Sequence, residues 1–243
     1  MRHFGLIGFP LSHSFSKKYF SEKFQREHIA DCHYENYPLP SVDLFLGLIK
    51  QTENMEGLNI TIPYKESVIS HLDYLDPEAE KIHAVNCIHI NNGKSTGFNT
   101  DIIGFERSLN PLLQAHHNHA LILGTGGASK AVSYVLSKLN ISFHCVSRQK
   151  KGDYFTYDGL TEEIIRQNTL IINTTPLGTS PEIHQCPDIP YQFLGKEHLL
   201  YDLIYNPAET LFLQKGKQQG AVIKNGYEML VLQAEASWEI WNR

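Results

Sequence analysis

The chain has 243 residues, of which 42% are hydrophobic and 19% are charged, a composition typical of a globular protein with one large domain or two medium ones. Its 26 acidic and 21 basic residues give a formal charge of -5, which provides no general attraction for nucleic acid or for an anionic membrane. Glycine and proline interrupt the apolar N-terminal run, which excludes a signal peptide or membrane span there. We expect a cytoplasmic protein, a monomer or a homodimer, whose partners are small molecules.

Cysteine and histidine patterns predict no metal site. The four cysteines are scattered without a CxxC pair, so their simplest interpretation is as reduced structural thiols. The histidine cluster at 116–119 lies in an expected connector between domains, and metal-ligand spacing is absent elsewhere. We interpret this cluster as a solvated surface.

The first half of the chain alternates between extended and helical segments. Strands are expected over residues 4–7, 32–37 and 57–63, and helices from about residues 17 and 41. This order predicts a parallel sheet with right-handed crossovers, and therefore an α/β fold.

Two serines, Ser14 and Ser16, lie between the first strand and the first helix. Ser16 is expected to be the N-cap of that helix, because a serine oxygen there accepts a backbone N–H of the first turn. Alternatively, both hydroxyls bind a small anion such as a carboxylate, together with the helix amides. Both roles stay open for Ser16, and the residues alone support neither strongly for Ser14.

The segment GLNITIPYK, residues 57–65, is the first candidate for chemistry. Its alternation of apolar and polar residues indicates a strand that ends at Pro63, since proline cannot donate to a central ladder. Lys65 then lies beyond the carboxyl end of the strand, where open α/β sheets bind ligands. A lysine there can polarise a carbonyl or transfer a proton; an ordinary solvated lysine is the alternative.

A hairpin is expected around the Asn92-Gly93 turn. The pairing brings Asn86 and Asp101 to the same rim. Asp101 is either the N-cap of the helix that follows it or a carboxylate that holds Lys65 charged and in position.

The second half opens on a glycine loop, GTGGAS, at 124–129, between an apolar strand and an amphipathic helix. Such glycines allow a tight turn and a close approach to a pyrophosphate, whose charge meets the helix N-terminus. Ser129 replaces the third glycine of GxGxxG, and similar loops occur without cofactors. The strand and helix around the loop favour dinucleotide binding.

The end of the next strand predicts which cofactor binds. An NAD-binding chain offers an acidic residue here for the ribose hydroxyls, whereas this chain has SRQKK, residues 147–151. Three cations in an acidic protein suit a 2′-phosphate, so we infer NADP rather than NAD. The alternative is a solvated basic turn with no preference for that phosphate.

Further polar residues are expected at the carboxyl edge of the second sheet, among them Thr174 and Tyr205, although each alone is more often part of a turn. A helix is expected from about Ala208 and another from about Tyr227. Gln233 interrupts the apolar surface of the last helix and either addresses a ligand or faces solvent.

Eight motifs in order resemble the shikimate dehydrogenase family over nearly the whole chain: GFPLSHSFS, GLNITIPYK, AVNCI, GFNTD, GTGGAS, NTTPLG, YDLIYNP and NGYEMLVLQA. The resemblance implies reversible NADPH-dependent reduction of 3-dehydroshikimate to shikimate, in aromatic amino-acid precursor synthesis. It implies an N-terminal α/β substrate domain with a mainly parallel sheet, residues 1–103, completed by the C-terminal helix 227–243. A Rossmann-type NADP-binding domain then occupies residues 104–226.

The resemblance also implies roles for single residues. Lys65 and Asp101 match the catalytic pair. The matches to substrate-binding positions are Ser14, Ser16, Asn59, Thr61, Lys65, Asn86, Asp101, Tyr205 and Gln233. The matches to NADP-binding positions are Gly124, Thr125, Gly126, Gly127, Ala128, Ser129, Ser147, Arg148, Leu203 and Gly226. Lys151 of the basic turn and Thr174 at the sheet edge are further cofactor-binding candidates.

Three residues depart from the family pattern: Lys17 replaces a common proline, Thr125 a common alanine, and Ser147 a common asparagine. Two other functions stay open. A related enzyme class oxidises quinate as well as shikimate, often with NAD, and the basic turn argues against it. A non-catalytic sensor of shikimate or nucleotide is the other, and the presence of both Lys65 and Asp101 argues against it.

Overall fold

The computed structural model describes residues 1–11 and 14–243, which form two compact units. Unit 1 comprises residues 1–100 and 234–243, and unit 2 comprises residues 101–233. Two helices, α4 (Thr100–Leu109) and α8 (Tyr227–Trp241), each contribute residues to both units. The domain boundaries expected at 103 and 227 stay predictions.

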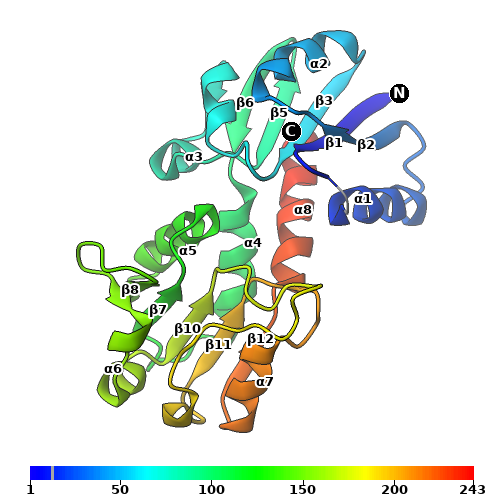
Figure 1. The fold of residues 1–243 in the computed structure, drawn as a ribbon. Coiled ribbons are helices and arrows are strands. Elements are labelled where there is room, and N and C mark those ends of the chain that lie inside the picture. Colours follow the sequence, from blue (N-terminus) through cyan, green and yellow to red (C-terminus); the bar gives the residue numbers. More distant parts are fainter. Residues whose placement is uncertain (12–13) are drawn as a thin grey trace. The chain divides into compact units, whose positions relative to one another are not determined.

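Unit 1 contains a six-stranded sheet with the order β2-β1-β3-β5-β6-β4 (Figure 1). Its strands are β1 (Arg2–Gly8), β2 (Cys32–Pro38), β3 (Met55–Ile60), β4 (Tyr74–Leu75), β5 (Cys87–Asn91) and β6 (Lys94–Phe98). β1 is parallel to both β2 and β3, as the strand–helix alternation predicts. β5 is antiparallel to β3 and forms the expected hairpin with β6.

The helices of unit 1 are α1 (Phe15–Arg26), α2 (Phe45–Gln51) and α3 (Pro77–Ile82), with 3₁₀ turns η1 (Val42–Leu44) and η2 (Ser67–His71). The end of α8 packs closely against the sheet. The Trp241 ring stacks on Phe4 with centroids 4.9 Å apart, and its indole N–H donates to the carbonyl of Ile88. A Cβ at Gly57 would lie 2.3 Å from the Trp241 indole nitrogen, so only glycine admits the ring here.

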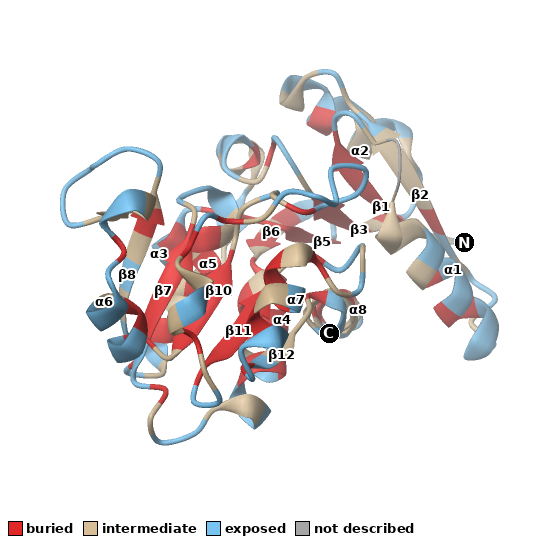
Figure 2. Ribbon diagram, turned by 60° about the horizontal axis from the view of Figure 1, so that its bottom comes forward, coloured by how far each residue is buried: buried red, intermediate tan, exposed pale blue. Residues whose placement is uncertain are grey.

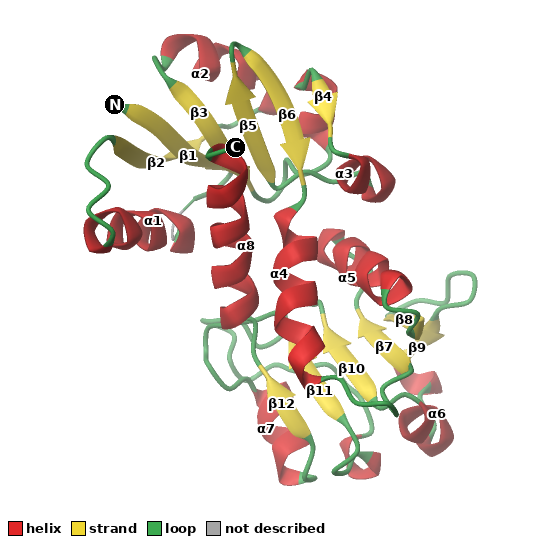
Figure 3. Cartoon of the chain, turned by 180° about the vertical axis from the view of Figure 1, so that it is seen from behind, coloured by secondary structure: helices red, strands yellow, loops and turns green. Residues whose placement is uncertain are grey.

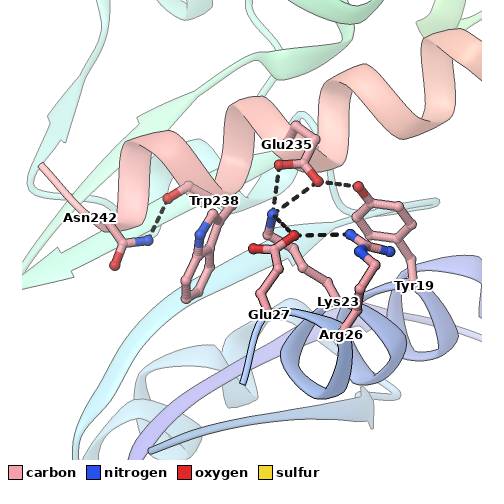
Figure 4. Close-up of polar contacts among 7 residues, drawn as sticks. All are labelled: Tyr19, Lys23, Arg26, Glu27, Glu235, Trp238 and Asn242. Carbon is pink, nitrogen blue, oxygen red and sulfur yellow. Dashed lines mark hydrogen bonds and ion pairs between the residues drawn. The ribbon is translucent and has the colours of Figure 1, made fainter. Parts of the chain in front are cut away.

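A polar cluster joins α1 to the C-terminal part of α8 (Figure 4). Lys23 is only 4% exposed, and its ammonium lies 2.8 Å from Glu235 and 3.0 Å from Glu27. The Tyr19 hydroxyl also donates to Glu235, and burial together with this carboxylate raises the pKa of Tyr19. The buried lysine charge is thus neutralised by carboxylates from two helices, as burial of a charge requires.

Unit 2 contains a second six-stranded sheet, with the order β12-β11-β10-β7-β8-β9 and only parallel pairs. Its strands are β7 (His119–Leu123), β8 (Ser142–Ser147), β9 (Phe155–Thr156), β10 (Leu170–Asn173), β11 (Leu199–Asp202) and β12 (Val222–Lys224). Figure 2 shows β7, β10 and β11 buried along most of their length. Strands buried on both faces are typical of a doubly wound sheet, which confirms the predicted α/β fold.

The helices of unit 2 besides α4 and α8 are α5 (Gly127–Lys138), α6 (Glu162–Gln167) and α7 (Leu211–Gln218), with 3₁₀ turns η3 (Asn110–Leu112), η4 (Tyr157–Gly159) and η5 (Tyr191–Phe193). α4 and α8 run side by side (Figure 3). A Cβ at Gly104 would lie 2.5 Å from the carbonyl oxygen of Met229, so the two helix backbones approach closely at this glycine.

Three expected element boundaries are wrong. The N-cap of α1 is Ser14, not Ser16, because the Ser14 hydroxyl accepts the Lys17 N–H at 3.1 Å. Helix α4 already begins at Thr100, so Asp101 lies in its first turn and is not its N-cap. Helix α7 begins at Leu211, since the Thr210 side chain caps it.

The strand expected to reach Pro63 ends instead at Ile60. The Thr61 N–H still bonds to Ile7, but the Tyr64 N–H turns back to the Thr61 carbonyl and closes a turn. Ile62 is consequently 75% exposed.

The histidine cluster at 116–119 is not the solvated surface that the sequence predicts, since His117 is buried. Its Nδ1 accepts the Gln114 N–H, and burial lowers its pKa.

Candidate functional site

A pocket of about 450 Å³ lies at the carboxyl edge of the sheet in unit 2. Three segments that each follow a strand form most of its wall: the glycine loop after β7, the basic turn after β8 and the polar turn after β10. Its lining residues are Gly124, Thr125, Gly126, Val146, Ser147, Arg148, Tyr157, Thr174, Thr175, Pro176 and Leu177. The structure therefore brings six of the predicted cofactor residues together around one cavity.

The glycine loop requires glycine at position 124 for two reasons. Its φ is +105°, a conformation that other residues rarely adopt. A Cβ there would also lie 2.9 Å from both Thr174 Oγ1 and Thr175 Cγ2. Backbone atoms of the glycine loop therefore form part of the pocket surface, which a phosphate group can approach closely.

The basic turn contributes one cation to the pocket. Arg148 lines the cavity, whereas the Lys150 ammonium donates to the Tyr154 carbonyl at 3.0 Å. Lys151 is exposed and is not among the lining residues. The Ser147 hydroxyl donates to the carbonyl of Gln149, inside the turn.

The other predicted cofactor residues lie outside the lining. Gly127 and Ala128 begin helix α5, and the Ser129 hydroxyl donates to the Gly126 carbonyl at 2.6 Å. Leu203 and Gly226 contact one another, because a Cβ at Gly226 would lie 2.1 Å from the Leu203 carbonyl oxygen.

Sequence reasoning missed the buried carboxylate that supports this pocket. Asp202 is fully buried at the end of β11 and accepts hydrogen bonds from Asn173 Nδ2, Thr210 Oγ1 and the Ile204 N–H. Asn173 Oδ1 in turn accepts from the N–H and hydroxyl of Thr175, which lines the pocket. Burial raises the pKa of Asp202 to about 6, although its three donors oppose the shift. The sequence feature that could have indicated this carboxylate is the aspartate of YDLIYNP, which ends an apolar strand.

Unit 1 places four predicted site residues near the carboxyl ends of β1 and β3. Ser14 and Ser16 follow β1 and begin α1, where Ser14 Oγ caps the helix. Thr61 and Lys65 follow β3, and both are partly exposed. The Lys65 carbonyl accepts the Val85 N–H, which holds the lysine backbone beside the start of the β5 segment.

Two further predicted residues, Asn59 and Asn86, are buried, with exposures of 5% and 4%. Asn86 Oδ1 accepts the Thr100 N–H at 2.6 Å, which confirms that the hairpin brings Asn86 to the start of α4. Asn59 Nδ2 donates to the carbonyl of Asn86.

The remaining predicted residues, Asp101, Tyr205 and Gln233, belong to unit 2. Tyr205 follows β11 and is 40% exposed. Gln233 is 8% exposed rather than solvent-facing, and its amide donates to the Leu230 carbonyl at 3.0 Å. The approach of Asp101 to Lys65 stays a prediction.

Comparison with known proteins places this site in a family. A protein-family profile described as "Shikimate dehydrogenase substrate binding domain" matches residues 6–88. The shikimate dehydrogenase (NADP(+)) of Methanococcus maripaludis is 38% identical over 258 residues, which cover 98% of this chain and 90% of that protein.

Solved structures agree with this likeness. The shikimate 5-dehydrogenase of Thermus thermophilus, in complex with NADP(H) and shikimate, matches with a TM-score of 0.87 and 28% identity, covering 99% of this chain and 93% of that one. The 5-ketofructose reductase of a Gluconobacter species matches with a TM-score of 0.86 and 27% identity, covering 100% and 93%. The fold alone therefore does not select a substrate. Among the residues that the structure describes, no helix combines the length and the apolar character needed to cross a membrane.

Proposed function

This chain belongs to the shikimate dehydrogenase family, and we propose that it reduces 3-dehydroshikimate reversibly to shikimate with NADPH, using Lys65 and Asp101 as its catalytic pair. The observation that carries the function is the identity with NADP-dependent shikimate dehydrogenases over nearly the full chain. The pocket beside Gly124 adds a cofactor site whose walls suit a dinucleotide.

The residues around that pocket fit NADP. The glycine loop and the N-terminus of α5 suit the pyrophosphate, because both can present backbone N–H groups to an anion. Arg148 lines the pocket and is proposed to pair with the 2′-phosphate, since a guanidinium binds phosphate through two parallel hydrogen bonds. Bound NADPH supplies the hydride for the substrate carbonyl carbon.

Lys65 acts on the carbonyl oxygen in this proposal. As charge develops on that oxygen, the ammonium stabilises it and donates a proton, so that the alcohol forms and the lysine regains a proton from solvent. Asp101 is proposed to position Lys65 and to orient a substrate hydroxyl. Proton transfer of this kind contributes roughly 10²–10⁴-fold in rate, and ordering of the reactants roughly 7–11 kcal/mol.

The substrate carboxylate is assigned to Ser14 and Ser16. The Ser14 oxygen already accepts the Lys17 N–H, yet its hydrogen stays available, because a hydroxyl donates and accepts at once. Thr61, Asn86, Tyr205 and Gln233 are proposed to surround the ring and its hydroxyls.

Two sets of residue ranges divide most of these tasks, although Tyr205, proposed to contact the substrate, lies in the NADP-binding range. We assign substrate binding to residues 1–103 with 227–243, and NADP binding to residues 104–226; the profile match over 6–88 supports the first assignment. A cytoplasmic location is supported by the four cysteines, all of which are free thiols. A monomer and a homodimer are both consistent with the chain.

The test is the change in nicotinamide absorbance when the purified protein meets shikimate with NADP or with NAD. Rapid reduction of NADP and much slower reduction of NAD are expected. Quinate and 5-ketofructose, the latter with NADPH, serve as competing substrates, and faster turnover of either would overturn the substrate assignment. Binding of shikimate without turnover would instead indicate a sensor.

A further inference from the structure

A chain of buried hydrogen bonds crosses the interior of unit 1. It begins at the Tyr34 hydroxyl on β2, which donates to Asn59 Oδ1 on β3 at 2.8 Å. Asn59 Nδ2 donates onward to Ser237 Oγ on α8 at 3.0 Å and to the Asn86 carbonyl at 3.3 Å. Tyr34, Asn59 and Ser237 are 2%, 5% and 0% exposed, so these bonds exchange little with water.

The chain continues from Ser237 to the start of α4. Ser237 Oγ lies 3.2 Å from Thr100 Oγ1, which donates to Asn86 Oδ1 at 3.2 Å. Either of these two hydroxyls can be the donor of the hydrogen bond between them. The Ser237 hydroxyl accepts from Asn59 and shares a hydrogen bond with Thr100, and so joins the two halves of the hydrogen-bond chain.

The orientation of both amides follows from these partners. A backbone N–H can only donate, so the oxygen of Asn86 must face Thr100 and its Nδ2 must point the other way. A backbone carbonyl can only accept, so Asn59 must direct its nitrogen at Asn86 and its oxygen at Tyr34. Both Nδ2 hydrogens of Asn59 and its oxygen are thus engaged inside the protein.

We propose that Ser237 is a positioning residue for the substrate. Through Thr100 it holds the Asn86 amide with its donor hydrogens directed away from the network, and through Asn59 it holds the end of β3 ahead of Thr61. Asn59 then acts through Asn86 and the strand rather than by binding substrate itself. The proposal rests on the proposed function, because it assumes that Asn86 binds the substrate.

Ser237→Ala is the direct test. It leaves one Asn59 hydrogen and the Thr100 oxygen without their buried partner, which costs enough to let both side chains reorient. We expect the KM for shikimate to rise about tenfold, while the KM for NADP stays within about twofold of wild type. Ser237→Thr restores the hydroxyl and is expected to recover most of the loss.

Glu235→Gln is the matched control, two residues earlier on the same helix (Figure 4). It weakens the contact of α8 with Lys23 and Tyr19 but leaves the Ser237 bonds intact. If the role of Ser237 is purely structural, both variants should lower the unfolding midpoint, and the two variants should have the same KM for shikimate. Equal KM values for the two variants would overturn the proposal.

Thr100→Val is the second variant if Ser237→Ala fails to fold, since it removes the hydroxyl on the Thr100 side of the contact with Ser237. An unchanged KM for shikimate in this variant would again contradict the proposal.

Calorimetric titration with shikimate separates this inference from the proposed function. A wild type that binds shikimate without reducing NADP would remove the catalytic assignment, yet weaker binding by Ser237→Ala than by Glu235→Gln would still support positioning. A wild type that neither binds nor oxidises shikimate would overturn both.

Discussion

Each unit has a buried polar network at the carboxyl end of its sheet, and the two networks differ in charge. In unit 1, neutral hydroxyls and amides connect Tyr34, Asn59 and Ser237. In unit 2, a single carboxylate, Asp202, accepts three hydrogen bonds. Hydrogen bonds to a charged acceptor are stronger, but they depend on pH. The neutral network has no such dependence near neutral pH, since burial raises the pKa of Tyr34 further above its ordinary value of 10.0.

In the proposed function Lys65 of unit 1 supplies the proton and the pocket of unit 2 binds the cofactor, and the largest predicted effect tests that division. Lys65→Ala should lower kcat by roughly 10²–10⁴-fold, because proton transfer is lost. Its NADP dissociation constant should match that of wild type in a fluorescence titration. Lys50→Ala, which removes an exposed lysine of α2, is the control. Near-normal turnover in Lys65→Ala would exclude this lysine from the mechanism.

The next effect tests how strongly unit 2 depends on its carboxylate. Asp202→Ala leaves three donors without their acceptor, and we expect the free energy of unfolding to fall by about 3 kcal/mol in urea denaturation. Asp202→Asn keeps an acceptor of the same shape and should be much less destabilising. Equal losses in the two variants would indicate that the carboxylate itself is required and that a neutral side chain of the same volume cannot replace it.

The charge difference predicts a pH dependence carried by unit 2. The pKa of Asp202 is about 6 in the folded chain, above its ordinary value of 3.8, so the folded state binds this proton more tightly. The stabilising contribution is therefore complete below the ordinary pKa and is lost as pH rises through about 6. Between about pH 4 and pH 7, wild type should lose up to roughly 3 kcal/mol of unfolding free energy relative to Asp202→Asn. A constant difference between the two would contradict the shift.

The smallest effect concerns the phosphate. Arg148→Gln should raise the KM for NADP about tenfold and leave the KM for NAD unchanged, because one charge-assisted contact is removed. Lys150→Gln is the matched control, since that ammonium is bonded to the Tyr154 carbonyl in the same turn. If both variants lose NADP affinity equally, the turn attracts the cofactor by its summed charge rather than through Arg148.

Features that depend on consecutive residues could be predicted from the sequence. The glycine loop at 124–129, the Asn92-Gly93 hairpin and the parallel order of the strands are such features, because local φ preferences and period-2 patterns produce them. The pocket walls at Gly124, Arg148 and Thr174 follow, since parallel strands bring the segments after them to one edge.

The partners of buried polar side chains were decided only by the tertiary structure. Asn59 bonds to Ser237, 178 positions away, a pairing that no local pattern indicates, while its role as a substrate ligand stays a prediction. Tyr157 reaches the cofactor pocket from η4, a position for which no local pattern exists. Ser14 rather than Ser16 caps α1, because its oxygen accepts the N–H of Lys17 in the first turn of the helix. The sequence by itself determined which segments are strands and where the glycine loop lies. Sheet register and helix packing decided which hydroxyls, amides and carboxylates meet, since those pairings join residues far apart in the chain.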